Sequence, residues 1–176
     1  DGTTAVALMY LYLSKIVEKK YLDFYIPDRN SEGYGISNEG IDFAKENNFA
    51  LIIALDCGIK AIDKIEYAKN LGVDFIICDH HLPGDQIPKA VAVLDPKRKD
   101  CRYPFKELSG CGVGFKLCQG LNTIYKIPEA ELFELTDLLA ISIAADIVSM
   151  TGENRVLAKQ GLKILRKSRN LGLRML

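Results

Sequence analysis

The residues of this chain that can do chemistry gather at the ends of two apolar runs. Residues 50–55 are followed by Asp56, and residues 74–78 are followed by Asp79, His80 and His81. These are the only two histidines among the 176 residues. Imidazoles and carboxylates together suit Mn²⁺ and similar divalent ions, and bridging carboxylates are typical of two-metal sites. The pattern predicts a divalent-metal site; the alternative is a pair of solvated loop histidines that cap the next segment.

Two further carboxylates fit the same kind of site. Asp1 precedes Gly2-Thr3-Thr4 at the opening of a predicted helix, and Asp146 interrupts the apolar stretch 138–150. A carboxylate inside an apolar helix is costly unless it is paired or metal-bound. For Asp146 the alternative is an ordinary helix-end acid that is exposed to water.

The elements that must position these residues follow from the hydrophobic pattern. Apolar runs predict strands at 22–26, 50–55, 74–78 and 90–94. Helical periodicity predicts helices at 3–17, 37–47, 59–71, 112–126, 129–149 and 153–168. Unbroken apolar strands between helices are typical of a parallel sheet covered on both faces, so we expect an α/β fold with a helical C-terminal region. Ligands bind at the carboxyl ends of such strands, where Asp56 and Asp79 would lie.

Charge and cysteine content exclude several classes of protein. Lys+Arg and Asp+Glu both number 23, which excludes a disordered polyelectrolyte and argues against a uniformly basic nucleic-acid binder. All seven charged residues from Arg155 onward are basic, however, so residues 1–154 carry a net charge of −7. No apolar run reaches the roughly 18 residues of a membrane helix. The five cysteines form no CxxC pair, so we expect reduced thiols in a cytoplasmic protein with no membrane partner.

The ordered motifs resemble those of a known family. Four segments are similar to the motifs of the DHH phosphoesterase superfamily: Asp1-Gly2-Thr3-Thr4, Asp56-Cys57-Gly58, Asp79-His80-His81 and Asp146. The spacers at 27–37, 109–117 and 153–162 resemble the RecJ branch of that superfamily. The resemblance implies a DHH-type α/β domain and a metal-dependent exonuclease of DNA repair and recombination. Such an enzyme degrades single-stranded DNA from the 5′ end and releases 5′-mononucleotides.

The resemblance also assigns roles to individual residues. It implies two divalent ions, with Mn²⁺ favoured and Mg²⁺ as the alternative. The implied ligands are Asp1, Asp56, His80 and Asp146, with Asp56 as the bridge between the ions. His81 would lie beside the metals, holding the scissile phosphate or exchanging a proton. Asp79 would orient the histidines, because ligand imidazoles donate their other N–H to such an acceptor.

Three residues are candidates for contacts with DNA. Arg29 and Tyr34 flank a glycine-rich turn and suit a phosphate contact and a stacked base; the alternative is a surface arginine and a loop aromatic over the sheet edge. Arg155 begins a run of basic residues at three- and four-residue spacing, which predicts a backbone-tracking face or simply a solvated one. The glycine-rich turn at 109–114 can bind phosphate or allow close helix packing, and we favour packing.

The resemblance gives a domain division and a set of partners. It implies a catalytic domain at 1–152 and a basic helix at 153–176 that leads towards a substrate-binding domain. Family motif I has a further Asp before the Asp-Gly, so we expect these 176 residues to fold but to hydrolyse DNA weakly or not at all. Expected partners are single-stranded DNA and single-strand-binding or helicase proteins, with the chain as a monomer. The alternatives are a DHH oligoribonuclease or nucleotide phosphatase, a cyclic-dinucleotide phosphodiesterase, and a non-catalytic replication scaffold.

Overall fold

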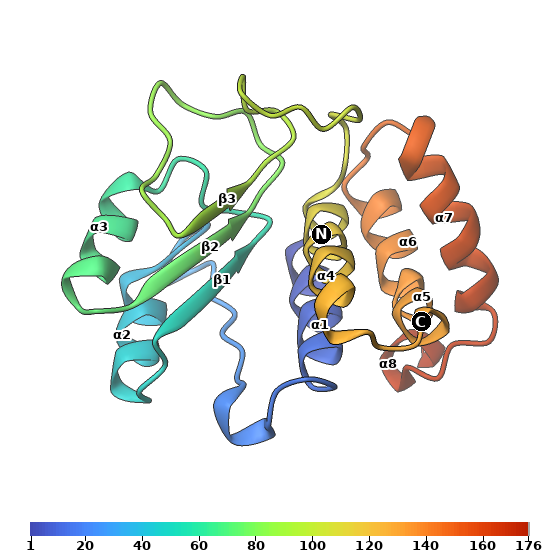
Figure 1. Cartoon of the computed structure of the whole chain (residues 1–176), viewed down its shortest axis with the longest axis horizontal. Helices are drawn as coiled ribbons and strands as arrows, with labels where there is room; N and C mark the ends of the chain where they lie inside the picture. Colours follow the sequence, from blue (N-terminus) through green and yellow to red (C-terminus); the bar gives the residue numbers. More distant parts are fainter. Residues whose placement is uncertain (176) are drawn as a thin grey trace.

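A three-stranded parallel sheet is formed by residues between 51 and 94 (Figure 1). The computed structural model describes residues 1–175. The strands are β1 (Leu51–Leu55), β2 (Asp74–Cys78) and β3 (Ala92–Leu94), in the order β1-β2-β3. These are three of the four predicted strands, the third shortened at its start.

The register of the sheet brings the strand ends to one level. Leu55 of β1 is paired with Cys78 of β2, and Cys78 is paired with Leu94 of β3. The next residue after each strand is an aspartate: Asp56, Asp79 and Asp95. The parallel sheet therefore delivers three carboxylates to the same edge.

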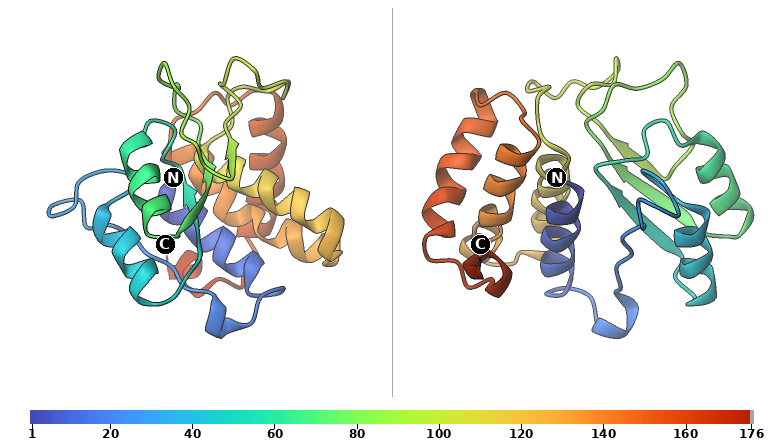
Figure 2. Two further views of the ribbon diagram at one scale, coloured as in Figure 1. Left: turned by 60° about the vertical axis from the view of Figure 1, so that its left-hand side comes forward. Right: turned by 180° about the vertical axis from the view of Figure 1, so that it is seen from behind.

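Helices cover both faces of the sheet, as predicted. Figures 1 and 2 show α2 (Asn38–Glu46) and α3 (Ile62–Asn70) on one face, and α1 (Gly2–Leu13) and α4 (Gly110–Tyr125) on the other. Each face has its own hydrophobic cluster: Phe75 and Ile77 belong to the first, and Leu8 and Phe115 to the second. Ser37 caps α2, since its Oγ accepts a hydrogen bond from the Gly40 N–H at 3.0 Å.

A helical layer packs beyond α1 and α4, as expected for the C-terminal region (Figure 2). It consists of α5 (Glu129–Glu134), α6 (Thr136–Ala145), α7 (Gly152–Leu165) and α8 (Leu171–Met175). The predicted helix at 129–149 is broken at Leu135, where the Thr136 hydroxyl donates to the Phe133 carbonyl. In residues 1–175 the structure contains no helix that is both long and apolar enough to cross a membrane.

The predicted strand at 22–26 is wrong. Leu22 has extended φ and ψ angles, but the segment is paired with no strand, and within residues 1–175 β1 pairs only with β2. An extended segment needs a hydrogen-bonded neighbour to become a strand, so the apolar pattern alone was insufficient. The preceding residues form α1, which ends at Leu13 rather than Val17, and a short 3-10 helix, η1 (Lys19–Tyr21).

Candidate metal site

Asp56 lies where the sheet meets two helix N-termini. Its backbone N–H donates to the Cys78 carbonyl at 2.8 Å and so extends the β1–β2 ladder by one residue. Its φ of 62° is left-handed, which Asp tolerates better than most residues but which still costs free energy. A Cβ built on Gly2 would lie 3.4 Å from Asp56 Oδ2, and one built on Gly110 would overlap Asp56 Oδ1. The partial positive charge of the α1 and α4 N-termini favours a carboxylate at this place.

Asp1 is held by the first turn of α4. Its Oδ2 accepts a hydrogen bond from the Gly110 N–H at 2.6 Å. Its Oδ1 accepts from the Cys111 N–H at 2.8 Å and from Ser142 Oγ at 2.7 Å. The glycine-rich turn thus uses these N–H groups on Asp1, a role that neither interpretation of the sequence included. The contribution of Ser142 was also missed, because a single serine in a helix carries no signal.

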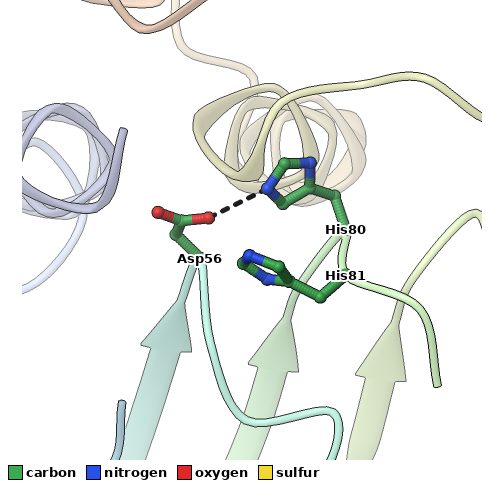
Figure 3. Close-up of side chains that lie close together, drawn as sticks. All are labelled: Asp56, His80 and His81. Atoms are coloured by element: carbon green, nitrogen blue, oxygen red, sulfur yellow. Dashed lines mark ion pairs between the residues drawn. The ribbon is translucent and has the colours of Figure 1, made fainter. Parts of the chain in front are cut away.

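His80 is surrounded by the acids that the sequence singled out. Its Nε2 lies 3.1 Å from Asp56 Oδ1, 3.5 Å from Asp146 Oδ2 and 3.7 Å from Asp1 Oδ2. Figure 3 shows the His80 ring facing the Asp56 carboxylate, with the His81 ring beside it. Burial of His80 opposes protonation, but the Asp56 and Asp146 carboxylates outweigh it and raise the pKa of the imidazole. The site therefore attracts positive charge.

Asp79 orients one histidine and the backbone around both. It is 1% exposed. Its Oδ1 accepts hydrogen bonds from the backbone N–H of His80 at 2.7 Å, the backbone N–H of His81 at 3.2 Å and the ring Nδ1–H of His81 at 2.7 Å. Its Oδ2 accepts from the Ile59 N–H at 2.8 Å. Burial opposes ionisation, but these donors outweigh it and lower the pKa of Asp79. The carboxylate bonds the ring of His81 and not the ring of His80.

Asp146 occupies a position that is unfavourable for a carboxylate. It is the C-cap of α6, where the helix carbonyls carry partial negative charge. Its Oδ2 is buried and has no hydrogen-bond partner among residues 1–175. It is thus a helix-end acid, as the alternative interpretation held, but one that lies against His80 and is not freely solvated. A cation would relieve the repulsion.

Orphaned polar atoms concentrate at this edge of the sheet. Seven buried side-chain nitrogen or oxygen atoms in the described stretch of the chain lack a hydrogen-bond partner. Five of them lie here: Asp56 Oδ1, His80 Nδ1, His80 Nε2, Asp95 Oδ2 and Asp146 Oδ2. The possible ligand atoms form two groups that share His80, namely Asp56–His80–His81 and Asp1–His80–Asp146. Clustered carboxylate oxygens and imidazole nitrogens fit divalent cations.

Asp95 was missed by the sequence interpretation. It follows β3 just as Asp56 follows β1, and it is 3% exposed. Burial raises the pKa of Asp95, and the negative charge of Asp79 adds to this effect, whereas the hydrogen bond from the Lys97 N–H works against it. The signal was present in the sequence, because the apolar run at 90–94 ends in an acid as the other two runs do.

The candidate DNA-binding residues lie outside the two ligand groups. Arg29 and Tyr34 are exposed, and the guanidinium carbon of Arg29 is 5.0 Å from the centre of the Tyr34 ring. Both line a cavity of about 850 Å³ between α1, α2 and β1, and Asp56 lines the same cavity. Arg155 is exposed in the first turn of α7.

The cysteines next to the site are packing residues. Burial, with added repulsion from Asp79 and Asp56, raises the pKa of Cys57 to about 12. Burial and the charge of Asp79 do the same for Cys78. A thiol with such a pKa is not a nucleophile at neutral pH.

Gly110→Ala is expected to displace the Asp56 carboxylate, because the added methyl group overlaps it. Since small misplacements at a site are costly, we expect the affinity for Mn²⁺ to fall by about tenfold or more in titration calorimetry. Gly120→Ala is the matched control, because that glycine is in the same helix with nothing within 4 Å of the added atom. Equal Mn²⁺ affinity in the two variants would show that Asp56 has room to move.

Comparison with known proteins shows which family the chain resembles. The sequence matches the DHH family, N-terminal domain, over residues 1–143. It is 45% identical to the single-stranded-DNA-specific exonuclease RecJ of Bacillus subtilis over all 176 residues, which is 21% of that protein. It is 37% identical to the Escherichia coli protein of the same name, covering 94% of this chain and 30% of that one.

Solved structures show the same fold. A crystal structure of exonuclease RecJ bound to manganese matches 98% of this chain and 43% of its own chain, with a TM-score of 0.85 and 31% identity. RecJ of Thermus thermophilus in complex with Mn²⁺ matches 99% of this chain and 24% of its own, with a TM-score of 0.81 and 29% identity. The chain thus spans less than half the length of these proteins. On the family match and the shared fold, it belongs to the DHH family.

Proposed function

We propose that this chain is the metal-binding region of a 5′-to-3′ exonuclease specific for single-stranded DNA. The observation that carries the proposal is the cluster of Asp1, Asp56, His80 and Asp146 with its orphaned buried atoms. Relatives named single-stranded-DNA-specific exonuclease support the substrate class. The manganese in the similar solved structures supports Mn²⁺ over Mg²⁺.

In this proposal Asp1, Asp56, His80 and Asp146 hold two divalent cations. Such cations, when bound, supply an activated water and compensate the charge of an in-line displacement at phosphorus. A carboxylate has about four lone-pair sites. The Asp1 carboxylate accepts three hydrogen bonds, so one site is left for a cation. The bridging role of Asp56 stays a prediction.

His81 is proposed to act on the substrate. Its side chain is 59% exposed, and its Nδ1 is bonded to the buried Asp79. When Nδ1 carries the proton, Nε2 is left as the free nitrogen. That nitrogen can exchange a proton with a phosphate oxygen or leaving group.

The proposed strand path runs from Asp56 along the cavity to Arg29 and Tyr34. The shared cavity supports it, and a cationic residue stacked on an exposed aromatic ring suits both phosphate and base.

Arg155 is proposed to contact the DNA backbone. The basic segment 153–176 is proposed to differ in role from the catalytic segment 1–152. Gly161 of α7 lies against the Thr136 carbonyl of α6, so the two segments pack together. The proposed division between them is therefore one of role. We propose that the protein acts as a monomer on strands supplied by single-strand-binding or helicase proteins.

The test is a comparison of substrates with the intact protein and Mn²⁺. The proposal requires faster hydrolysis of long single strands with a free 5′ end than of duplex DNA or dinucleotides, and loss of hydrolysis with a chelator. A preference for dinucleotides would favour an oligoribonuclease or cyclic-dinucleotide phosphodiesterase. Absence of both Mn²⁺ binding and hydrolysis would favour a scaffold.

Arg29→Ala is expected to weaken binding of single-stranded DNA and to reduce the slope of log affinity against log salt by about 0.7, the value for one lost phosphate contact on a single strand. A fluorescence-anisotropy titration at several salt concentrations measures both. Lys69→Ala is the control, since this exposed lysine lies at the end of α3 away from the candidate site. An unchanged slope for Arg29→Ala would remove Arg29 from the strand path.

A further inference from the structure

Asp95 has a buried oxygen atom for which the described residues provide no partner. Its Oδ1 accepts a hydrogen bond from the Lys97 N–H at 2.7 Å. Its Oδ2 is buried and unpaired within residues 1–175. Burying an unpaired carboxylate oxygen costs free energy, so an aspartate at this position calls for an explanation.

His80 has a complementary unpaired nitrogen. Its Nε2 faces Asp56, Asp1 and Asp146, whereas Nδ1 lies on the other side of the ring, away from Asp56 (Figure 3). That Nδ1 is buried and without a partner among the described residues. A histidine that binds a metal through one nitrogen almost always donates the other N–H to an acceptor.

Asp79 is not available as that acceptor. Four N–H groups already converge on its two oxygens, one of them from the ring of His81. The sequence interpretation expected Asp79 to orient both histidines, but the geometry leaves Nδ1 of His80 without an acceptor.

Asp95 is placed beside His80 by the sheet. Where β2 and β3 end, the Asp79 N–H donates to the Leu94 carbonyl at 3.0 Å, so His80 and Asp95 each follow one residue of this hydrogen-bonded pair. Asp95 belongs to neither group of possible metal ligands. With Oδ1 fixed by Lys97, Oδ2 is the free acceptor.

We propose that Asp95 is a positioning residue for His80: its Oδ2 accepts the Nδ1–H of His80 and so keeps Nε2 free to bind a divalent cation. The proposal rests on the proposed function in so far as His80 is taken as a metal ligand. The two atoms are not in direct hydrogen-bond contact in the structure. The proposed link therefore requires one bridging water or a rotation of the two side chains.

Asp95→Asn tests this role sharply. The amide oxygen can still accept from the Lys97 N–H, but the NH₂ group then takes the place of Oδ2 and donates where the carboxylate accepted. The Nδ1–H tautomer of neutral His80, which competes with a proton on Nε2 facing Asp56, is therefore expected to lose population in the variant. Long-range ¹H–¹⁵N NMR of the metal-free chain, above the pKa of His80, measures this directly. His81, bonded to Asp79, is the internal reference and keeps its tautomer.

Calorimetry with Mn²⁺ gives the second readout. Loss of an outer partner of a ligand typically costs about 10–100-fold in metal affinity, which we expect for Asp95→Asn. Asp85→Asn is the matched control, because it removes the same charge from an exposed position on the loop after His81. It should leave both the tautomer of His80 and the Mn²⁺ affinity unchanged.

The wild-type chain alone can overturn the proposal. If neutral His80 shows no detectable Nδ1–H tautomer in the wild type, Asp95 does not hold that proton, whether or not the variant folds. Unchanged tautomer and affinity in a folded Asp95→Asn variant would also overturn it. If instead the wild type shows the Nδ1–H tautomer but binds no Mn²⁺, the proposed function fails while the assigned hydrogen bond stands.

Discussion

Asp56→Asn is expected to remove measurable Mn²⁺ binding, and with it the hydrolysis proposed for the intact protein, while leaving the metal-free chain folded. Asparagine tolerates the left-handed φ of 62° as well as aspartate does, so the backbone is not strained further. What is lost is the negative charge between the α1 and α4 N-termini, 3.1 Å from His80 Nε2. Loss of a residue that only supports a metal ligand typically lowers metal affinity by about 10–100-fold. We therefore expect loss of Asp56, a proposed ligand itself, to lower Mn²⁺ affinity by at least about 100-fold.

Thermal unfolding with and without Mn²⁺ separates this effect from a general loss of stability. Mn²⁺ at 100 times the wild-type Kd should stabilise the wild type by about 2.7 kcal/mol and Asp56→Asn by less than about 0.5 kcal/mol. The variant without Mn²⁺ should be about as stable as the wild type, because relief of the repulsion among Asp1, Asp56 and Asp146 offsets the loss of the carboxylate from the two helix N-termini. Asp85→Asn, with the same chemical change on an exposed loop, should respond to Mn²⁺ like the wild type. Equal stabilisation of Asp56→Asn would exclude Asp56 from the site.

The sequence was sufficient for the central sheet and for the gathering of acids around His80. Strands that are buried on both faces have unbroken apolar runs, so 50–55 and 74–78 were recognisable from composition alone. Parallel pairing then places Asp56 and Asp79 at one edge, whatever the details of the helices. The segment at 22–26 failed for the opposite reason: its strand character depends on a neighbour, which its own residues do not encode.

The remainder of the site depends on contacts between distant segments of the chain. The bonds from the Gly110 N–H and Ser142 Oγ to Asp1 join residues more than 100 positions apart. No local pattern specifies such partners. The assignment of Asp79 to His81 and the proposed assignment of Asp95 to His80 could not be predicted from the sequence for the same reason. Adjacent residues suggested that Asp79 served both rings, but only the fold shows that its oxygens are fully used.

The second large effect is expected for Asp79→Asn, on stability. The Asp79 carboxylate is 1% exposed and accepts four hydrogen bonds. In the variant one of the two carboxylate oxygens is replaced by an NH₂ group, which is a donor and therefore faces an N–H group that it cannot bond. Since a buried hydrogen bond to a charged group contributes about 1.5–3 kcal/mol, we expect the free energy of unfolding to fall by about 3 kcal/mol in urea denaturation. Asp74→Asn, the same change at the exposed start of β2, should cost less than about 0.5 kcal/mol.

The pH dependence of that difference identifies its origin. Because the pKa of Asp79 is lowered in the folded chain, its stabilisation is complete above the unfolded pKa of about 3.9 and is lost as the pH falls through the folded value. The gap in unfolding free energy between wild type and Asp79→Asn should therefore be constant near neutral pH and narrow below about pH 4. A gap that stays constant through acid pH would mean that shape, and not the ionised carboxylate, accounts for the loss. In that case Asp79 would have no electrostatic role in holding His81 and the loop at Ile59.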